Sequence, residues 1–287
     1  MEQPAGFRYI DAHTHLHPPW LAQAIRRWFA ERTHWRLDYP TEPAEVAAFL
    51  RARGVERFAF FSYAHKAGIA REINRWLRET ARGIPDGLPL ATVHPDDDDP
   101  VGVVETALEA YGFYGLKCHI QVQRFYPDDP RMLPVYARLV EADRVLVIHA
   151  GTAPHGSQFV GLERLARVLE RFPDLRVALC HMGAYETPLA FQLLERFPNL
   201  FLDTTMAMTP ASTPYTGIEP GRISDETLCR FADRILFGSD FPNLPYDYEE
   251  ERRGLWDRDL PLEVYRKIFY ANALRFFRPG PAPGIAS

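Results

Sequence analysis

The sequence contains few cysteines and no run of apolar residues long enough to cross a bilayer. Its 287 residues include three cysteines, Cys118, Cys180 and Cys229, without a CxxC spacing. This set is too sparse for a disulfide framework or a thiolate zinc site and is typical of a reducing compartment. The first residues, MEQPAGFRYI, lack the basic start and apolar core of a signal peptide, and a membrane span needs about 18 to 20 apolar residues. We therefore expect a cytoplasmic protein that does not associate with a membrane.

The sequence also lacks an excess of positive charge. It has 38 acidic residues against 33 lysines and arginines, which gives a formal net charge of −5. Without a basic surface there is nothing to hold a polyanion by counterion release, so we expect no nucleic-acid partner. Hydrophobic residues make up 46% and charged residues 25% of the chain, as in ordinary globular proteins, so this composition excludes a disordered chain.

Short apolar runs typical of buried strands alternate with stretches that have apolar residues at helical spacing. This alternation predicts a parallel sheet covered by helices. After the first gap the repeat is roughly 25 to 35 residues, as in a (β/α)8 TIM barrel. No linker divides the chain, so we expect residues 1–287 to form one α/β barrel domain with inserted βα loops. The eight predicted strands are 8–13, 57–63, 88–93, 114–119, 144–149, 175–181, 199–204 and 234–240.

Two connections that follow predicted strands are unusually long. Residues 16–42 form an insertion after the first strand, and residues 206–223 follow the seventh. In a TIM barrel the active site is built from the βα connections, so both segments are candidates for lids or substrate walls. The insertion is rich in aromatic residues, which could serve a homodimer as well as a lid.

Histidines cluster at the carboxyl ends of the predicted strands, where a TIM barrel carries its active site. His13 ends the first strand and His15 lies just past it, His149 ends the fifth, His181 the sixth and Asp240 the eighth. Since the eighth strand of a closed barrel lies beside the first, we expect these side chains to converge. Imidazole and carboxylate ligands without thiolate favour one Zn²⁺, with Mn²⁺, Fe²⁺, Co²⁺ or Ni²⁺ as alternatives.

Strand alternation predicts which side chains face the interior of the barrel. On the fifth strand it places Val145, Val147 and His149 on one face. On the sixth strand it places Val177, Leu179 and His181 together, and it turns Cys180 toward the helices as a buried filler.

The motifs as a set resemble those of the amidohydrolase-related (amidohydrolase 2) family of the metal-dependent amidohydrolase superfamily. The resemblance extends over residues 9–277 and includes the branch of aminocarboxymuconate semialdehyde decarboxylase. It implies a distorted TIM barrel in which His13, His15, His149 and Asp240 bind a divalent metal and His181 acts beside it. The motifs that carry the resemblance are IDAHTHLH, GLKCHIQVQRFYPDDP, LVIHAG, LCHMGA, LFGSDFP and YANALRFF.

Such a centre favours hydrolysis as the first hypothesis. A metal-bound water of lowered pKa would attack a carbonyl, in a cyclic ester or amide, of a small carboxylate-bearing substrate. Asp240 would accept the proton of the water, and His181 would orient the water or stabilise the developing charge. The alternative is a non-oxidative decarboxylase of an aromatic or muconate-type acid at the same site. A third hypothesis is an inactive barrel that only binds a ligand.

Lys117 and His119 share one face of the fourth strand, with Cys118 on the other. We expect these two cationic side chains to bind the substrate carboxylate. Carbamylation of Lys117, which would bridge two metal ions as in binuclear relatives, is the alternative. The substrate carboxylate could also meet an arginine, for which the candidates are Arg36, Arg124 and Arg222. Of the loop histidines, His65 and His94 are candidates for pocket positions.

Overall fold

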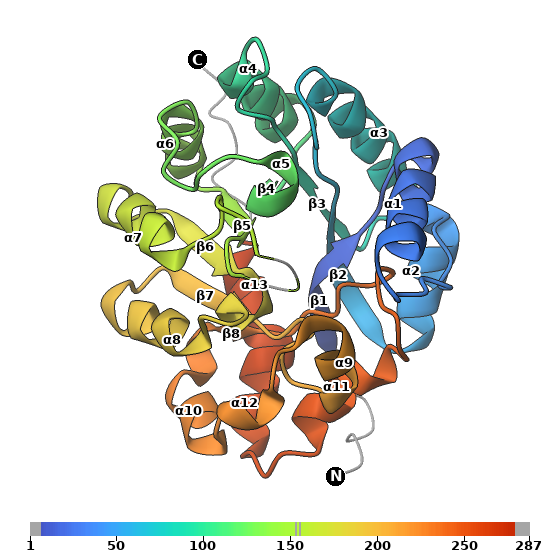
Figure 1. Cartoon of the computed structure of the whole chain (residues 1–287), viewed down its shortest axis with the longest axis vertical. Coiled ribbons are helices and arrows are strands. Elements are labelled where there is room, and N and C mark those ends of the chain that lie inside the picture. The colour runs from blue at the N-terminus through green and yellow to red at the C-terminus, as the bar shows by residue number, and fades with distance from the viewer. Residues whose placement is uncertain (1–6, 153, 155, 279–287) are drawn as a thin grey trace, which may run out of the picture.

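The computed structural model describes residues 7–152, 154 and 156–278. Eight parallel strands follow one another in the order β1 to β8 and form a barrel surrounded by helices (Figure 1). Each observed strand overlaps a predicted one, so the expected (β/α)8 TIM barrel is confirmed. The strands are β1 (Tyr9–His15), β2 (Val55–Phe61), β3 (Gly87–Ala91), β4 (Gly115–His119), β5 (Val145–His149), β6 (Arg176–Leu179), β7 (Leu200–Asp203) and β8 (Ile235–Leu236).

The connections between the strands hold the helices. The α-helices are α1 (Pro19–Arg32), α2 (Pro43–Ala52), α3 (Ala70–Arg82), α4 (Pro100–Glu105), α5 (Ile120–Gln123), α6 (Leu133–Glu141), α7 (Leu162–Arg171), α8 (Thr187–Arg196), α9 (Thr213–Thr216), α10 (Asp225–Arg230), α11 (Glu249–Trp256), α12 (Leu262–Arg266) and α13 (Asn272–Phe276). Short 3₁₀ or π segments are η1 (Thr106–Ala110), η2 (Cys180–Gly183), η3 (Pro210–Ser212), η4 (Pro220–Arg222), η5 (Ala232–Arg234) and η6 (Lys267–Ala271). None of the helices within these described residues is long and apolar enough to cross a bilayer.

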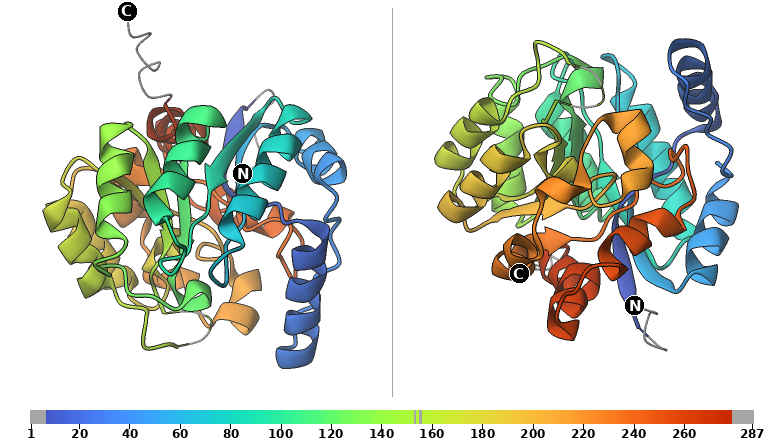
Figure 2. Two further views of the ribbon diagram at one scale, coloured as in Figure 1. Left: turned by 90° about the horizontal axis from the view of Figure 1, so that it is seen from above. Right: turned by 60° about the horizontal axis from the view of Figure 1, so that its bottom comes forward.

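The barrel is filled with apolar side chains and is closed at one end by α13. Arg176 at the start of β6 donates a hydrogen bond of 2.5 Å to the carbonyl of Phe276, which fixes α13 beneath the amino-terminal ends of the strands. The left view of Figure 2 shows the red C-terminal helices at one end of the barrel and α5 at the other. The opposite end of the barrel, where the carboxyl ends of the strands lie, is therefore the end at which a functional site can form. The inner core consists of Ile10, Ala12, Ala59, Phe61, Leu88, Leu90, Val145, Val147, Ala178, Cys180, Phe201, Leu236, Ala273, Phe276 and Phe277.

The barrel closes along a seam between β1 and the segment that follows β8. The regular strand β8 ends at Leu236, earlier than predicted, but the chain beyond it still pairs with β1. The amide of Asp240 donates to the carbonyl of His13 at 2.9 Å, and the amide of His15 donates to the carbonyl of Phe241 at 2.7 Å. The backbone itself therefore places the HxH motif beside Asp240.

An irregularity in β1 turns the two histidines of this motif into the barrel. The three residue steps from Asp11 to Thr14 oppose only two steps of β2. This extra residue is a bulge, which shifts the alternation of side chains along the strand. Ile10 before the bulge and Ala12 within it lie in the inner core, whereas His13 within the bulge and His15 after it contact Asp240 in the mouth of the barrel.

The sixth strand contradicts the predicted alternation, whereas the fifth follows it. Val177 and Leu179 pack in the outer core against the helices, and Cys180 lies in the inner core. The prediction that Cys180 faces the helices was therefore wrong. β6 ends at Leu179, and His181 reaches the mouth because η2 holds it in the left-handed conformation with φ 56° and ψ 32°.

A buried asparagine offers a test of how the helices attach to the barrel. Asn74 on α3 donates to the carbonyl of Thr92 and accepts from its amide, both at 2.9 Å. We expect Asn74→Ala to lower the free energy of unfolding by about 2 kcal/mol, because it leaves a buried peptide group unpaired. Asn199→Ala, which removes one partly exposed hydrogen bond to Pro173, should cost about 1 kcal/mol or less. Urea denaturation measures both, and equal losses would contradict the expectation.

Candidate active site

Two imidazoles meet one carboxylate at the seam. His13 Nε2 lies 3.1 Å and His15 Nε2 lies 3.0 Å from Oδ1 of Asp240. The left-handed backbone of Asp240, with φ 68°, presents its side chain to both rings. The structure therefore brings together three of the four predicted metal ligands.

Asp203 at the end of β7 joins this group to the sixth strand. Its Oδ2 lies 2.8 Å from His13 Nδ1, and its Oδ1 accepts a 2.8 Å hydrogen bond from the backbone amide of His181. The ring of His181 is fixed separately, because its Nδ1 lies 3.0 Å from the carbonyl of Thr205. Since a carbonyl only accepts, Nδ1 of His181 carries the proton and Nε2 is left for the cavity.

His149, the fourth predicted ligand, lies one ring further from the seam. Its ring centroid is 4.7 Å from that of His181, and it stacks on His119 at 4.2 Å with an interplanar angle of 10°. His13, His181 and Asp240 offer ligand atoms within 4.8 Å of one another. His181 was predicted to act beside the metal, but its ring nitrogen lies close enough to His13 and Asp240 to be a ligand as well.

The donor set fits a divalent cation. If His13 is neutral and donates its Nδ1 proton to Asp203, its Nε2 lone pair faces the oxygen of Asp240. Two electron-rich atoms at 3.1 Å are stabilised only by a proton or a metal ion between them. Burial lowers the pKa of His15 to about 4, so that imidazole is neutral and available for coordination. Nitrogen and oxygen ligands of this kind suit first-row divalent ions.

Lys117 is a buried cation at the base of the site. Its Nζ lies 3.0 Å from Cys180 Sγ, 3.4 Å from His13 Nε2 and 4.5 Å from the centre of the Phe61 ring. The side chain is 1% exposed, and no carboxylate of the described residues lies within 4.0 Å of its Nζ. An ammonium group buried in this way favours an anionic ligand.

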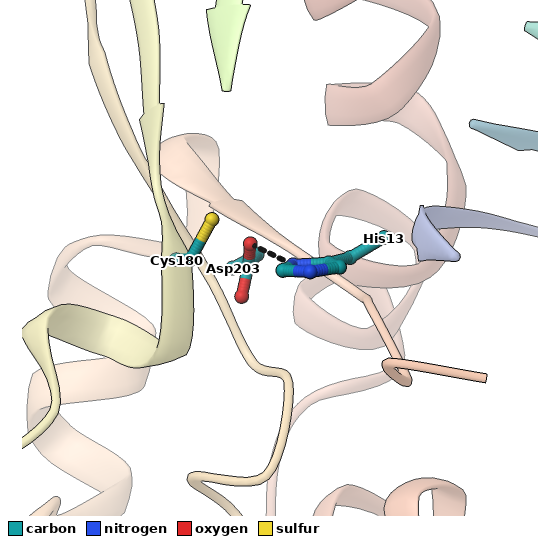
Figure 3. Close-up of side chains that lie close together, drawn as sticks. All are labelled: His13, Cys180 and Asp203. Carbon is teal, nitrogen blue, oxygen red and sulfur yellow. Dashed lines mark hydrogen bonds and ion pairs between the residues drawn. The ribbon is translucent and has the colours of Figure 1, made fainter. Parts of the chain in front are cut away.

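The side chain of Cys180 also lies close to those of Asp203 and His13 (Figure 3). His13, Cys180 and Asp203 form a second group with ligand atoms within 4.8 Å of one another. Because Asp203 already accepts from His13 Nδ1, that nitrogen is occupied, and we interpret the carboxylate as a group that orients His13.

A cavity of about 640 Å³ opens above these residues. Substrate candidates Lys117 and His119 both line it, as does His65, whereas His94 does not and instead lies 3.1 Å from the carbonyl of Gln123. The three arginines considered for the substrate carboxylate, Arg36, Arg124 and Arg222, are also absent from the described lining. Besides the seam residues and Lys117, the cavity is lined by Leu21, Ala24, Ile25, Trp28, Phe29, Trp35, Tyr63, His65, His119, Gln121, Val122, His149, Pro154, His181, Met206, Thr216, Ile218 and Asn243.

Asp203 is a site residue that the sequence interpretation missed, although one signal could have found it. It lies at the carboxyl end of the predicted strand 199–204 and is the last residue of β7, a position like that of the histidines at the ends of other strands. Asp11 was also missed. Its carboxylate accepts from the backbone amides of His13 and Ser239, at 3.2 and 3.1 Å, and so ties the two sides of the seam together.

A model of the amidohydrolase family matches residues 10–278. The chain belongs to the amidohydrolase family. The resemblance expected from the motifs is thus confirmed, and the protein is an enzyme of this family. The match covers the whole barrel, from β1 to the end of α13.

Proteins similar to this amidohydrolase include several named decarboxylases. The 6-methylsalicylic acid decarboxylase of Penicillium expansum is 25% identical over 93% of this chain and 95% of that protein. Among solved structures, an uncharacterised TIM-barrel protein from Bordetella bronchiseptica has a TM-score of 0.72 at 18% identity, covering 94% of this chain and 98% of that one. A 5-carboxyvanillate decarboxylase from Novosphingobium aromaticivorans, in complex with manganese and 4-hydroxy-3-methoxy-5-nitrobenzoic acid, has a TM-score of 0.65 at 17% identity, covering 95% and 96%.

The role of Asp203 can be tested through metal affinity. We expect Asp203→Asn to weaken binding of Mn²⁺ by about 10- to 100-fold, because the amide no longer fixes the ring of His13 for coordination. Asp174→Asn, an exposed change of the same kind, should leave the affinity unchanged. Competition with a chelating dye measures both constants, and equal affinities would show that Asp203 does not orient the ligand.

The protonation of His13 gives a pH prediction. Burial and Lys117 lower the pKa of His13, but Asp203 raises it, and the net result lies well above the ordinary value. Metal must displace this proton, so the apparent Mn²⁺ affinity should keep rising as the pH increases beyond about 6.5. Calorimetry in buffers of different ionisation enthalpy counts the released protons. An apparent Mn²⁺ affinity that stops rising at or below about pH 6.5 would contradict the expectation.

Proposed function

We propose that this amidohydrolase is a metal-dependent, non-oxidative decarboxylase of an aromatic acid, with a 2-hydroxybenzoate as the head group. The observation that carries the proposal is the buried Lys117 at the base of a cavity whose opposite walls are aromatic and apolar. An arene carboxylate matches both ends of this cavity. The decarboxylases among the similar proteins support this alternative better than the hydrolysis that the motifs first favoured.

The proposed metal ligands are His13, His15, His149 and Asp240. When bound, the ion would act as a Lewis acid toward the oxygen atoms of the substrate. We retain Zn²⁺ as the first candidate from the ligand types and add Mn²⁺ on the strength of the manganese bound to the 5-carboxyvanillate decarboxylase.

Lys117 and His119 would position the acid. Lys117 supplies a charge that attracts the carboxylate, and His119 has a buried Nδ1 without a hydrogen-bond partner among the described residues. Burial lowers the pKa of His119, so its ring is neutral and acts by hydrogen bonding. Both side chains lie on the same face of β4 and line the cavity.

His181 would deliver the proton that the reaction requires. In decarboxylation a proton adds to the ring carbon that bears the carboxylate, the bond to the carboxylate breaks, and its electron pair restores the aromatic ring as CO₂ leaves. Nδ1 of His181 is held at the carbonyl of Thr205, so Nε2 can take up a proton and pass it on. Because burial lowers the pKa of His181, its protonated form is a stronger acid than usual.

The function is tested with enzyme reconstituted with Mn²⁺ or Zn²⁺. The substrates are 2-hydroxybenzoic acids in one panel and lactones in another. CO₂ release and acid release are followed separately. Release of CO₂ from the aromatic acids supports the proposal, whereas turnover confined to the lactones would replace it with hydrolysis.

Lys117 should act mainly in substrate binding. We expect Lys117→Met to raise the KM for the acid by about 10- to 100-fold, because a charge-assisted interaction with the carboxylate is lost. The kcat should change less, since the carboxylate loses its charge during the reaction and Lys117 favours the ground state. Lys66→Met, an exposed change that lies outside the cavity lining, serves as the control. A fall in kcat at constant KM would assign Lys117 a different role.

A further inference from the structure

The cavity is much larger than the head group of the proposed substrate. Its volume of about 640 Å³ lies within the range of roughly 300 to 1,000 Å³ that accommodates drug-sized ligands. A hydroxybenzoic acid has only about ten non-hydrogen atoms and leaves much of such a space unfilled. The apolar side chains of the lining are available to bound this remaining space.

The apolar part of the lining comes mainly from two segments. One segment is the insertion 16–42, whose helix α1 presents one face to the cavity, and the other is the connection after β7. Within the described lining, Lys117 is the one lysine, and there is no arginine. We define the apolar chamber as Leu21, Ala24, Ile25, Trp28, Phe29, Trp35, Met206 and Ile218.

The two segments contact each other, so together they form a defined wall of the cavity. His34 Nε2 lies 3.2 Å from the carbonyl of Pro214, and the His34 ring stacks on Tyr215 at 5.2 Å. The Trp35 ring meets Tyr215 edge to face at 5.8 Å and stacks on Phe29 at 4.8 Å. These contacts hold the aromatic side chains in place beside the cavity.

We propose that the apolar chamber is a subsite for an extended alkyl substituent on the aromatic acid. The inference rests on the proposed function for the identity of the acid head group. A second charged group is disfavoured there, because its burial among apolar side chains would be uncompensated. The substrate class is therefore an aromatic monocarboxylic acid with an unbranched chain of several carbons, whose head lies at Lys117 and whose chain extends along α1.

Chain length is the first test. The assay uses 6-alkylsalicylic acids from methyl to heptyl with the Mn²⁺ enzyme. Each buried methylene should raise kcat/KM by up to about fourfold until the chamber is filled. A kcat/KM that stays flat or falls beyond the methyl compound would overturn the subsite.

A pair of variants on one helix tests the location. Ala24 lines the chamber, whereas Ala30 lies exposed on α1 outside the lining. Ala24→Phe should reduce the preference for heptyl over methyl, measured as the ratio of the two kcat/KM values, at least tenfold. Ala30→Phe should leave this ratio unchanged. An unaltered chain preference in Ala24→Phe would overturn the proposed location.

A binding assay separates the subsite from the reaction. Trp28 and Trp35 line the chamber, so 3-alkylphenols, the products of the proposed reaction, should quench tryptophan fluorescence with a Kd that falls as the chain lengthens. Chain-dependent binding without CO₂ release from any acid would overturn the proposed function and support the subsite. CO₂ release with no chain dependence in either assay would overturn the subsite alone.

Discussion

The carboxylate of Asp203 positions two of the histidines on which the site depends. One oxygen holds His13 Nδ1 and the other holds the backbone amide of His181, both at 2.8 Å. The first contact leaves Nε2 of His13 directed at Asp240, and the second stabilises the left-handed turn that brings His181 to the mouth of the barrel. Hydrogen bonds to a carboxylate are stronger than neutral ones, so one buried side chain holds both the ring of His13 and the backbone of His181.

The polar side chains at the base of the cavity are largely buried. Burial lowers the pKa values of His15, His119 and His149, which keeps these rings neutral. Neutral rings are the forms that coordinate metals and accept protons. In the proposed function, the polar base of the cavity would bind the acid group of the substrate, and the apolar walls would bind its substituent.

Strand spacing and strand ends could be predicted from the sequence because they depend on local patterns. Apolar runs marked the eight strands, and His13, His15 and Asp240 were found because they end strands that meet at the seam. Strand alternation failed where the regular strand ended, since the direction of His181 is set by left-handed backbone after Leu179.

Other features depend on contacts between distant segments and could not be read from local patterns. Asp203 gains its role only through partners on β1 and after β6, so a lone aspartate at a strand end gave little indication of it. The same applies to the walls of the cavity, because the insertion 16–42 is held by Tyr215 and Pro214, far along the chain. The arginines considered for substrate binding, such as Arg36, are absent from the described lining of the cavity.

The seam between β1 and the segment after β8 also bears on how the protein matures. His15 and Asp240 stand 225 residues apart in the chain, so the proposed cation site can form only after the last strand has joined the first. A nascent chain that has emerged from the ribosome without its final quarter presents the HxH motif but lacks the carboxylate. Because a bound ion stabilises the state that binds it, metal binding would occur late in folding and would stabilise the closed barrel against unfolding.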